Sequence, residues 1–153
     1  MRSKEFVIKG VPISSGIVMG TTRVVLPGEA QVAEIPIPAS GIPREIEALE
    51  TAVEKTLAEL RTMQQSASRK IGDPIAKIFD AQLLIAGDYE FLKRVKAEIA
   101  DRRLNAGYIY HTLVQEAVTP LMQSPDRYLR QMAIDVDSVA EKVLAHLSGR
   151  RER

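Results

Sequence analysis

A long apolar stripe with the spacing of an α-helix constrains this chain more than any other feature. Apolar residues recur every three or four positions at Ile46, Leu49, Val53, Leu57, Leu60 and Met63. Side chains with this spacing lie on one face of a helix. Pro43 suits the first turn, because the N–H that proline lacks would be unpaired there. The pattern predicts a helix over residues 43–69, about 40 Å long at 1.5 Å per residue.

Four further helical segments follow, and each has residues that favour a helix start. These are caps or first-turn prolines at Asp73 and Pro74, at Asp88, at Asn105, and at Ser124 and Pro125. Glycines are expected to break or end helices at Gly72, Gly87 and Gly149, and the fourth helix is expected to run to about Val118. The predicted fold class is therefore mainly α: an antiparallel helical bundle of about five helices with a short N-terminal β segment.

The first 38 residues differ in kind from the rest. Short β-prone runs at 6–8, 17–19 and 24–26 are separated by glycine and proline. In the sequence IPIP at 35–38, each proline pushes the residue before it into extended geometry, which excludes a helix. We expect one or two strands over 5–27 and an irregular linker over 28–41. The predicted organisation is a β segment and linker over 1–38, a helical domain over 39–149 and a frayed tail over 150–153.

The composition argues against several classes of protein. The 153 residues carry a net charge of +1, which gives no basic footprint for nucleic acid. No apolar run approaches the roughly 20 residues that a membrane helix needs, and the N-terminal MRSKEF lacks the apolar region of a signal peptide. Cysteine is absent, so there is no disulfide framework. We expect a cytoplasmic protein whose partners include neither nucleic acid nor a membrane.

The ordinary catalytic motifs are missing as well. The two histidines, His111 and His146, form no H-x-x-H or H-E-x-x-H pattern, so a metal site has little support. His146 lies at a predicted helix end, where a cation complements the helix dipole, and a packing role is the simpler interpretation of His111. Asp135 and Asp137 are two apart in a helix and face different directions, so they form no carboxylate dyad. On the evidence of motifs alone, we would expect a helical protein that is not catalytic.

Four segments of the chain nevertheless follow a known pattern in order: 10–20, 44–60, 71–99, and 105–117 together with 126–147. Residues 78–92, IFDAQLLIAGDYEFL, resemble the pattern IF-x-AH-x-x-x-L-x-DPEL of the helical domain of the bacterial phosphotransferase-system enzyme I. Residues 10–20, GVPISSGIVMG, are similar to the opening strand and turn of that family, and 44–60, REIEALETAVEKTLAEL, to its first long helix. Residues 105–117, NAGYIYHTLVQEA, and 126–147, DRYLRQMAIDVDSVAEKVLAHL, resemble its later helices.

The resemblance is to the N-terminal part of phosphoenolpyruvate–protein phosphotransferase, and it implies a function. In that family a helical subdomain binds the carrier protein HPr. An α/β subdomain holds the phosphate-accepting histidine in a G-G-x-x-(S/T)-H-x-A-I motif, which does not occur in these 153 residues. The resemblance therefore implies an HPr-docking domain that lacks the phosphohistidine and phosphoenolpyruvate-binding parts. Alone, this segment would be non-catalytic and need no cofactor, whereas the parent enzyme would use Mg2+.

The same resemblance suggests which residues contact the carrier. On the second helix and the start of the third they are Ile78, Ala81, Gln82, Ile85 and Phe91. Neighbouring helices would add Leu121, Leu129 and Met132, the last standing where the family has arginine. Acidic residues expected to flank the patch and attract a basic carrier are Asp73, Asp80 and Glu90.

An argument from the residues themselves supports such a patch. The second helix carries apolar residues on more than one face, whereas a bundle helix buries one stripe, and the surplus can form an exposed partner site. We interpret Phe79, Leu83 and Leu92 as core residues, and Ile78, Gln82 and Ile85 as docking residues. We expect Ile85→Asp to weaken carrier binding without unfolding the bundle.

Other functions stay open at the level of sequence. A helical scaffold or self-association module with no phosphotransfer role is the main alternative, since unpaired N-terminal strands invite pairing between chains. A homodimer through those strands, or through a C-terminal domain outside this sequence, is consistent with either function. The sequence does not distinguish carriers of sugar, nitrogen-related and dihydroxyacetone-linked systems.

Overall fold

The computed structural model describes residues 9–11, 15–17, 19–21 and 32–148. By its contacts the chain divides into two compact units, residues 1–30 and 31–153. The strands expected over 5–27 fall largely outside the described residues. The residues of this range that are described belong to no strand. Gly149 and the tail 150–153 also lie outside them.

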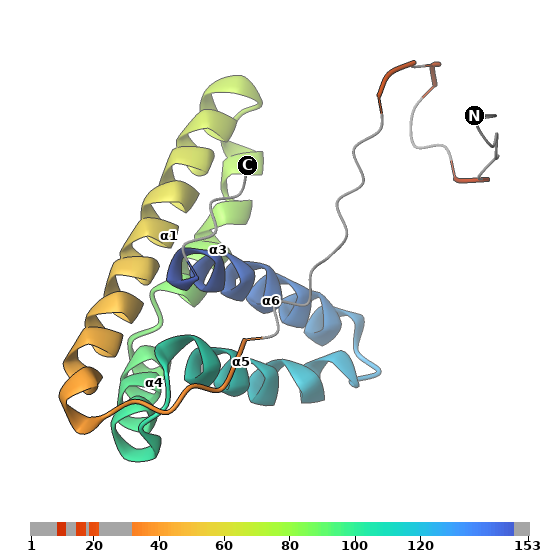
Figure 1. The fold of residues 1–153 in the computed structure, drawn as a ribbon. Helices are drawn as coiled ribbons and strands as arrows, with labels where there is room; N and C mark the ends of the chain where they lie inside the picture. The colour runs from red at the N-terminus through yellow and green to blue at the C-terminus, as the bar shows by residue number, and fades with distance from the viewer. Residues whose placement is uncertain (1–8, 12–14, 18, 22–31, 149–153) are drawn as a thin grey trace, which may run out of the picture. The chain divides into compact units, whose positions relative to one another are not determined.

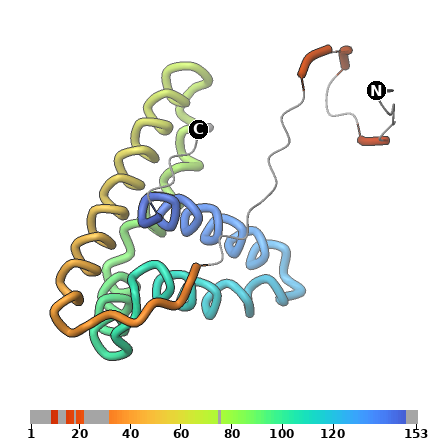
Figure 2. The backbone as a smooth tube through the Cα atoms, viewed as in Figure 1, coloured from red at the N-terminus to blue at the C-terminus, as the bar shows by residue number. Residues whose placement is uncertain are grey.

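The second unit contains the helices that the structure describes. A short 3-10 helix, η1 (Ala39–Gly41), leads into α1 (Ile42–Lys70), which is followed by α2 (Asp73–Ala76), α3 (Ile78–Ala86), α4 (Tyr89–Arg102), α5 (Ala106–Met122) and α6 (Arg127–Leu147). Figure 1 shows α2 and α3 returning along α1, and α5 paired with α6 in a second antiparallel hairpin that lies across the first. The same path can be followed as a tube in Figure 2. The predicted antiparallel helical bundle is confirmed.

Two of the predicted helix starts are confirmed closely. The first helix, expected over 43–69, is α1 (Ile42–Lys70), with a proline at the start of its first turn. Asp88 caps α4, and its Oδ1 accepts a hydrogen bond from the Phe91 N–H at 2.9 Å. The second predicted helix is divided at Lys77 into α2 and α3.

The other two predicted caps need correction. Asn105 occupies the cap position of α5, but its side chain makes no capping bond; its Oδ1 accepts from the Ile35 N–H at 3.0 Å. The first turn of α5 is capped instead by Glu45 of α1, whose Oε2 accepts from the Ala106 N–H at 2.8 Å. The cap of α6 is Asp126, so Pro125 lies before the helix and not in its first turn. The fourth helix also continues past Val118 to Met122.

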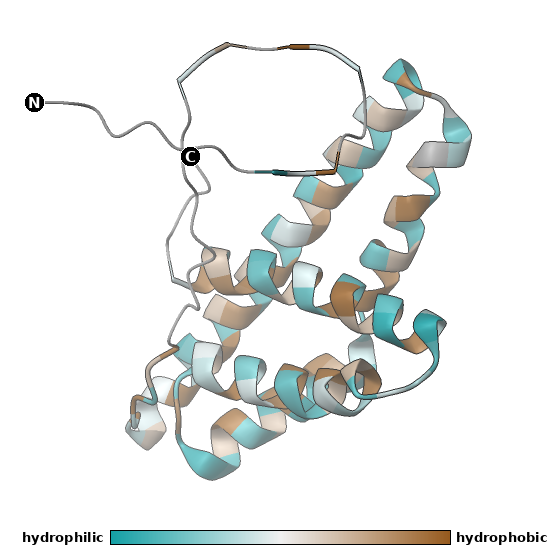
Figure 3. Cartoon of the chain, turned by 90° about the vertical axis from the view of Figure 1, so that its right-hand side faces the viewer, coloured by the Kyte–Doolittle hydropathy of each residue, from teal (hydrophilic) through white to brown (hydrophobic). Residues whose placement is uncertain are grey.

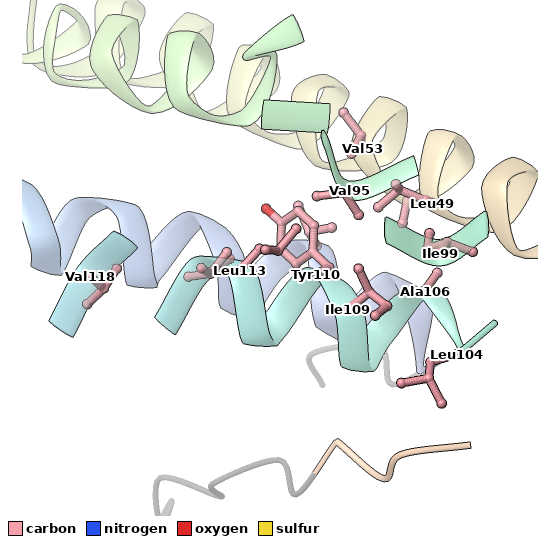
Figure 4. Packing of buried hydrophobic residues seen from close by; sticks show 14 of the residues in the cluster. Leu49, Val53, Val95, Ile99, Leu104, Ala106, Ile109, Tyr110, Leu113 and Val118 are labelled. Atoms are coloured by element: carbon pink, nitrogen blue, oxygen red, sulfur yellow. The ribbon is translucent and has the colours of Figure 1, made fainter. Parts of the chain in front are cut away.

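Most of the apolar core lies between α1, α4, α5 and α6. We call it the larger cluster, and its buried members are Leu49, Ala52, Val53, Val95, Ile99, Leu104, Ala106, Ile109, Tyr110, Leu113, Val114, Val118, Ala133, Ala140 and Val143. Figure 4 shows labelled side chains of α1, α4 and α5 converging around the Tyr110 ring. Burial raises the pKa of the Tyr110 phenol well above its usual value, because the charged form would lose its hydration. Tyr110 therefore stays neutral across the ordinary pH range.

A second, smaller cluster attaches α3 to the rest of the unit. It consists of Leu60 of α1, Ala86 of α3 and Val139 of α6. Phe79, Leu83 and Ile85 of α3 pack against it and are partly buried. In Figure 3 the helices carry apolar and polar bands side by side, as amphipathic packing requires. Among the described residues, no helix is both long enough and apolar enough to cross a bilayer.

The segment before η1 is held by the connection between α4 and α5. The Ile37 N–H donates to the Arg103 carbonyl at 2.8 Å and the Asn105 N–H to the Ile35 carbonyl at 3.0 Å. These bonds flank an isolated antiparallel bridge between Pro36 and Leu104. The extended geometry predicted for 35–38 therefore serves to fasten the linker across the helical unit.

Candidate partner-docking site

One side of α3 is apolar and faces solvent. Ile78 is 61% exposed and Leu84 is 76% exposed, and Ala81 is exposed between them. Gln82 and Ile85 follow Ile78 by four and seven positions, so they lie on its side of the helix, and both are half-buried. The predicted ridge is therefore not sealed inside the chain. Its role in binding a partner stays a prediction.

The opposite side of α3 holds the helix in place. Phe79 and Leu83 are half-buried against the smaller cluster, as expected for core residues, and Leu92 of α4 packs against the larger cluster. Ile85 also packs against the smaller cluster, so it belongs partly to the ridge and partly to the core. An Ile85→Asp change would therefore disturb packing as well as the exposed face, and Ile78 is the cleaner position at which to test docking.

Two of the acidic candidates bind other helices of the same chain. The Asp80 Oδ1 accepts from Gln64 Nε2 at 2.6 Å, and the Asp73 Oδ1 accepts from Ser68 Oγ at 2.5 Å. Both bonds join α1 to α2 or α3 at the exposed surface, so these aspartates fix the returning segment against α1. Glu90 is exposed in the first turn of α4, where its charge complements the helix dipole.

The end of the α5–α6 hairpin carries a second group of candidates. Leu121 and Leu129 are half-buried, and Met132 is 41% exposed. Tyr128 is 72% exposed and lies four residues before Met132, on the same side of α6. The sequence reasoning omitted Tyr128, although an aromatic residue beside an apolar helix stripe is a recognisable signal for an interface.

The two groups of candidates are linked through α6. Val139 follows Met132 by seven positions, so the side of α6 that carries Tyr128 and Met132 is the side that meets α3. Val139 and Ala86 belong to the same buried cluster. The contact between α3 and α6 therefore lies on the side of α6 that also carries Tyr128 and Met132.

Phe91 is the candidate that the structure uses differently. It is half-buried, packs against the larger cluster, and its ring meets the Tyr110 ring edge-on with centroids 5.7 Å apart. Such edge-to-face pairs stabilise a core beyond the area they bury. Phe91 therefore takes part in the packing of α4 against α5, and its contact with a carrier stays a prediction.

Neither histidine belongs to a metal or nucleophile arrangement in the described part of the chain. The His146 Nε2 lies 3.0 Å from Glu59 Oε1, which ties the end of α6 to α1. His111 is half-buried on α5. Among the described residues, no three His, Cys, Asp or Glu side chains are grouped so that they could bind a metal ion.

Solved structures with the same arrangement of helices define the class of protein to which the fold belongs. The N-terminal domain of "Enzyme 1 - Nitrogen" superimposes with a TM-score of 0.73 over 86% of this chain and 54% of that one, at 22% identity. The NMR solution structure of an enzyme I protein, nEIt, gives a TM-score of 0.73 over 79% of this chain and 49% of that one, at 24% identity. The fold is that of enzyme I N-terminal domains.

Sequence comparison gives the family. Residues 9–131 match the family described as "PEP-utilising enzyme, N-terminal", to which this chain belongs. The phosphoenolpyruvate-protein phosphotransferase of Geobacillus stearothermophilus is 33% identical over 147 residues, which cover 95% of this chain and 25% of the relative. The enzyme of Priestia megaterium is 29% identical over 142 residues, covering 93% of this chain and 24% of the relative. The chain thus spans about a quarter of the length of these two relatives.

Proposed function

We propose that this chain is the docking domain for an HPr-like phosphocarrier protein in a cytoplasmic enzyme I-like phosphotransferase. The observation that supports it is the uncovered apolar side of α3, where Ile78 is 61% exposed and Leu84 76% exposed. A helix that packs on one side and exposes apolar residues on the other is typical of a partner site. Family membership supports phosphotransfer as the setting.

The proposed surface combines the ridge on α3 with Tyr128 and Met132 on α6. Large apolar and aromatic residues near the centre of an interface supply most of its binding free energy. The acidic residues around the ridge, Asp80 and Glu90, lie at the rim, where charges mainly raise the association rate and orient a basic partner. Because Asp80 is also bonded to Gln64, we assign it a smaller part in recognition than Glu90.

The proposal is tested by titrating an HPr-type carrier into the isotopically labelled chain and following amide resonances by NMR. We expect shifts on α3 and at the end of the α5–α6 hairpin, and weakened binding in Ile78→Asp and Met132→Asp. A buried apolar anchor is worth about 2 kcal/mol or more when truncated, which corresponds to a Kd raised by roughly thirtyfold.

A matched control is available on the same helix. Ile134 is 51% exposed and lies two residues after Met132, about 200° around α6. Ile134→Asp introduces the same charge on the other side of the helix and should leave the Kd within about twofold. If Ile134→Asp weakens binding as much as Met132→Asp does, the docking face is wrongly placed.

Two further measurements test the absence of phosphorylation and the scaffold alternative. We expect the chain alone to remain unlabelled when it is incubated with labelled phosphoenolpyruvate and Mg2+, because the sequence has no phosphohistidine motif; stable label on His111 or His146 would contradict this. Carrier-independent self-association in sedimentation, without any shift on carrier addition, would favour the scaffold.

A further inference from the structure

The connection between α5 and α6 is short and is fastened by side chains on its own residues and on α6. It comprises residues 123–126, between the end of α5 and the start of α6. The Ser124 Oγ accepts from the Asp126 N–H at 3.1 Å, and the Asp126 Oδ1 accepts from the Tyr128 N–H at 2.8 Å. These two bonds are local and would form in many turns of this kind.

Arg130 makes a contact of a different kind. Its Nη1 donates to the carbonyl oxygen of Ser124 at 2.7 Å and to that of Pro125 at 2.8 Å. Arginine keeps its charge at all ordinary pH values, and hydrogen bonds from a charged donor are stronger than those between neutral groups. Two successive carbonyls on one nitrogen fix the orientation of the peptide planes in the connection.

The orientation of these planes decides where the neighbouring exposed side chains lie. Tyr128 is 72% exposed, so its position depends on its own backbone more than on packing. Leu121 and Leu129 flank the same connection and are half-buried. A partner that binds these residues binds more tightly if the connection is already ordered, because less conformational freedom is lost on association.

We propose that Arg130 is a positioning residue for carrier docking: by holding the Ser124 and Pro125 carbonyls it pre-orders the end of the hairpin before the carrier arrives. The proposal rests on the docking function proposed above. Arg130 is half-buried and lies outside both apolar clusters. The packing of α5 on α6 through Val118 and Ala133 does not require its guanidinium, so positioning and fold stability are separable.

The experiment compares Arg130→Gln and Arg130→Lys in the full chain with Arg94→Gln as a matched control. Arg94 of α4 lies 2.9 Å from Glu116 of α5 in an exposed ion pair, so its replacement removes the same charge away from the connection. We expect Arg130→Gln to raise the Kd for the HPr-type carrier about tenfold and Arg130→Lys about threefold, and Arg94→Gln to change it by less than about twofold. The thermal midpoints of all three should stay within a few degrees of the parent.

A second measurement needs no carrier. In the free chain, amide hydrogen exchange at residues 124 and 126–128 should accelerate in Arg130→Gln and change little in Arg94→Gln, whereas exchange on α1 and α4 stays the same. A purely structural role would speed exchange throughout α5 and α6 and lower the thermal midpoint.

The outcomes separate the two proposals. If the parent chain binds the carrier and Arg130→Gln binds equally well, or if exchange in the connection is unchanged, the role of Arg130 is refuted while docking stands. If Arg130→Gln and Arg94→Gln lose the same affinity, general charge explains the loss and the positioning role is refuted. If the parent chain shows no carrier binding, the proposed function fails and the role of Arg130 fails with it.

Discussion

The larger and the smaller apolar cluster differ in how many helices they join and in how fully they enclose them. The larger cluster joins α1, α4, α5 and α6 through many buried side chains. The smaller one, formed by Leu60, Ala86 and Val139, holds α3 by one side only, and the other side of α3 faces solvent. The chain itself therefore covers α3 on one side only, and the uncovered side is the one that we propose as the docking surface.

Removing a large side chain from the larger cluster should have the largest effect. Leu49 is fully buried on α1, and Leu49→Ala leaves a cavity in a densely packed site. We expect a loss of about 3–4 kcal/mol in the free energy of unfolding, measured by urea denaturation. The unfolding transition should shift as a whole, and a loss below about 1 kcal/mol would show that this cluster does not carry the fold.

The corresponding change in the smaller cluster should be milder and more local. Leu60 is also fully buried, on the same helix, which makes Leu60→Ala a matched partner for Leu49→Ala. We expect about 2–3 kcal/mol, because half-buried residues of α3 can shift toward the cavity. Amide exchange should accelerate on α3 before it does on α5. If both variants lose the same free energy of unfolding and show the same pattern of amide exchange, the two clusters do not differ in the way described.

Polar bonds at the surface supplement the smaller cluster. Gln64 Nε2 donates to Asp80 Oδ1 in the first turn of α3 at 2.6 Å. Gln64→Ala should cost about 1 kcal/mol, the typical net contribution of such a bond, and should raise exchange on α3. Gln131, whose Nε2 contacts Asp135 within α6 at 3.3 Å, is the control. Gln131→Ala should cost less than about half as much, and the reverse order would contradict a role for Gln64 in fixing α3.

The smallest expected effect is a gain. Arg103 ends α4 with φ 52° and ψ 49°, in the left-handed region, which costs a residue with a side chain roughly 1–2 kcal/mol relative to glycine. Arg103→Gly should therefore stabilise the chain by about 0.5–1 kcal/mol after the greater unfolded-state entropy of glycine is subtracted. Arg102→Gly, inside the last turn, should destabilise it by a similar amount. Thermal unfolding of both variants measures the difference. A loss of stability in Arg103→Gly would show that the left-handed backbone at this position is not strained.

The sequence predicted the elements that depend on local signals. The apolar period of α1 and the carboxylate cap at Asp88 need only neighbouring residues, and both are present in the structure. The signals failed where a distant residue intervened: Asn105 turns to Ile35, and Glu45 takes over the cap of α5. Pro125 shows a different limit, because a proline next to a cap residue fits either side of a helix start.

The candidate site was predictable to a similar degree. The interpretation of Phe79 and Leu83 as core residues and of Ile78 as an exposed residue agrees with their burial in the structure. The sequence did not show that the Phe91 ring meets Tyr110 of another helix, nor that Asp73 and Asp80 bond to α1. Burial across helices is set by the packing of several elements, which a single-helix pattern does not contain.

The bond from Ala106 to Glu45 spans 61 positions in sequence, and this has a consequence for the order of assembly. During synthesis Glu45, which accepts this bond, is made before α5. The first turn of α5 can therefore be capped as soon as α5 packs against α1. A fragment that starts after α1 would keep every residue of α5 and still lose that partner. The two helices are therefore expected to gain and lose structure together, as one cooperative unit.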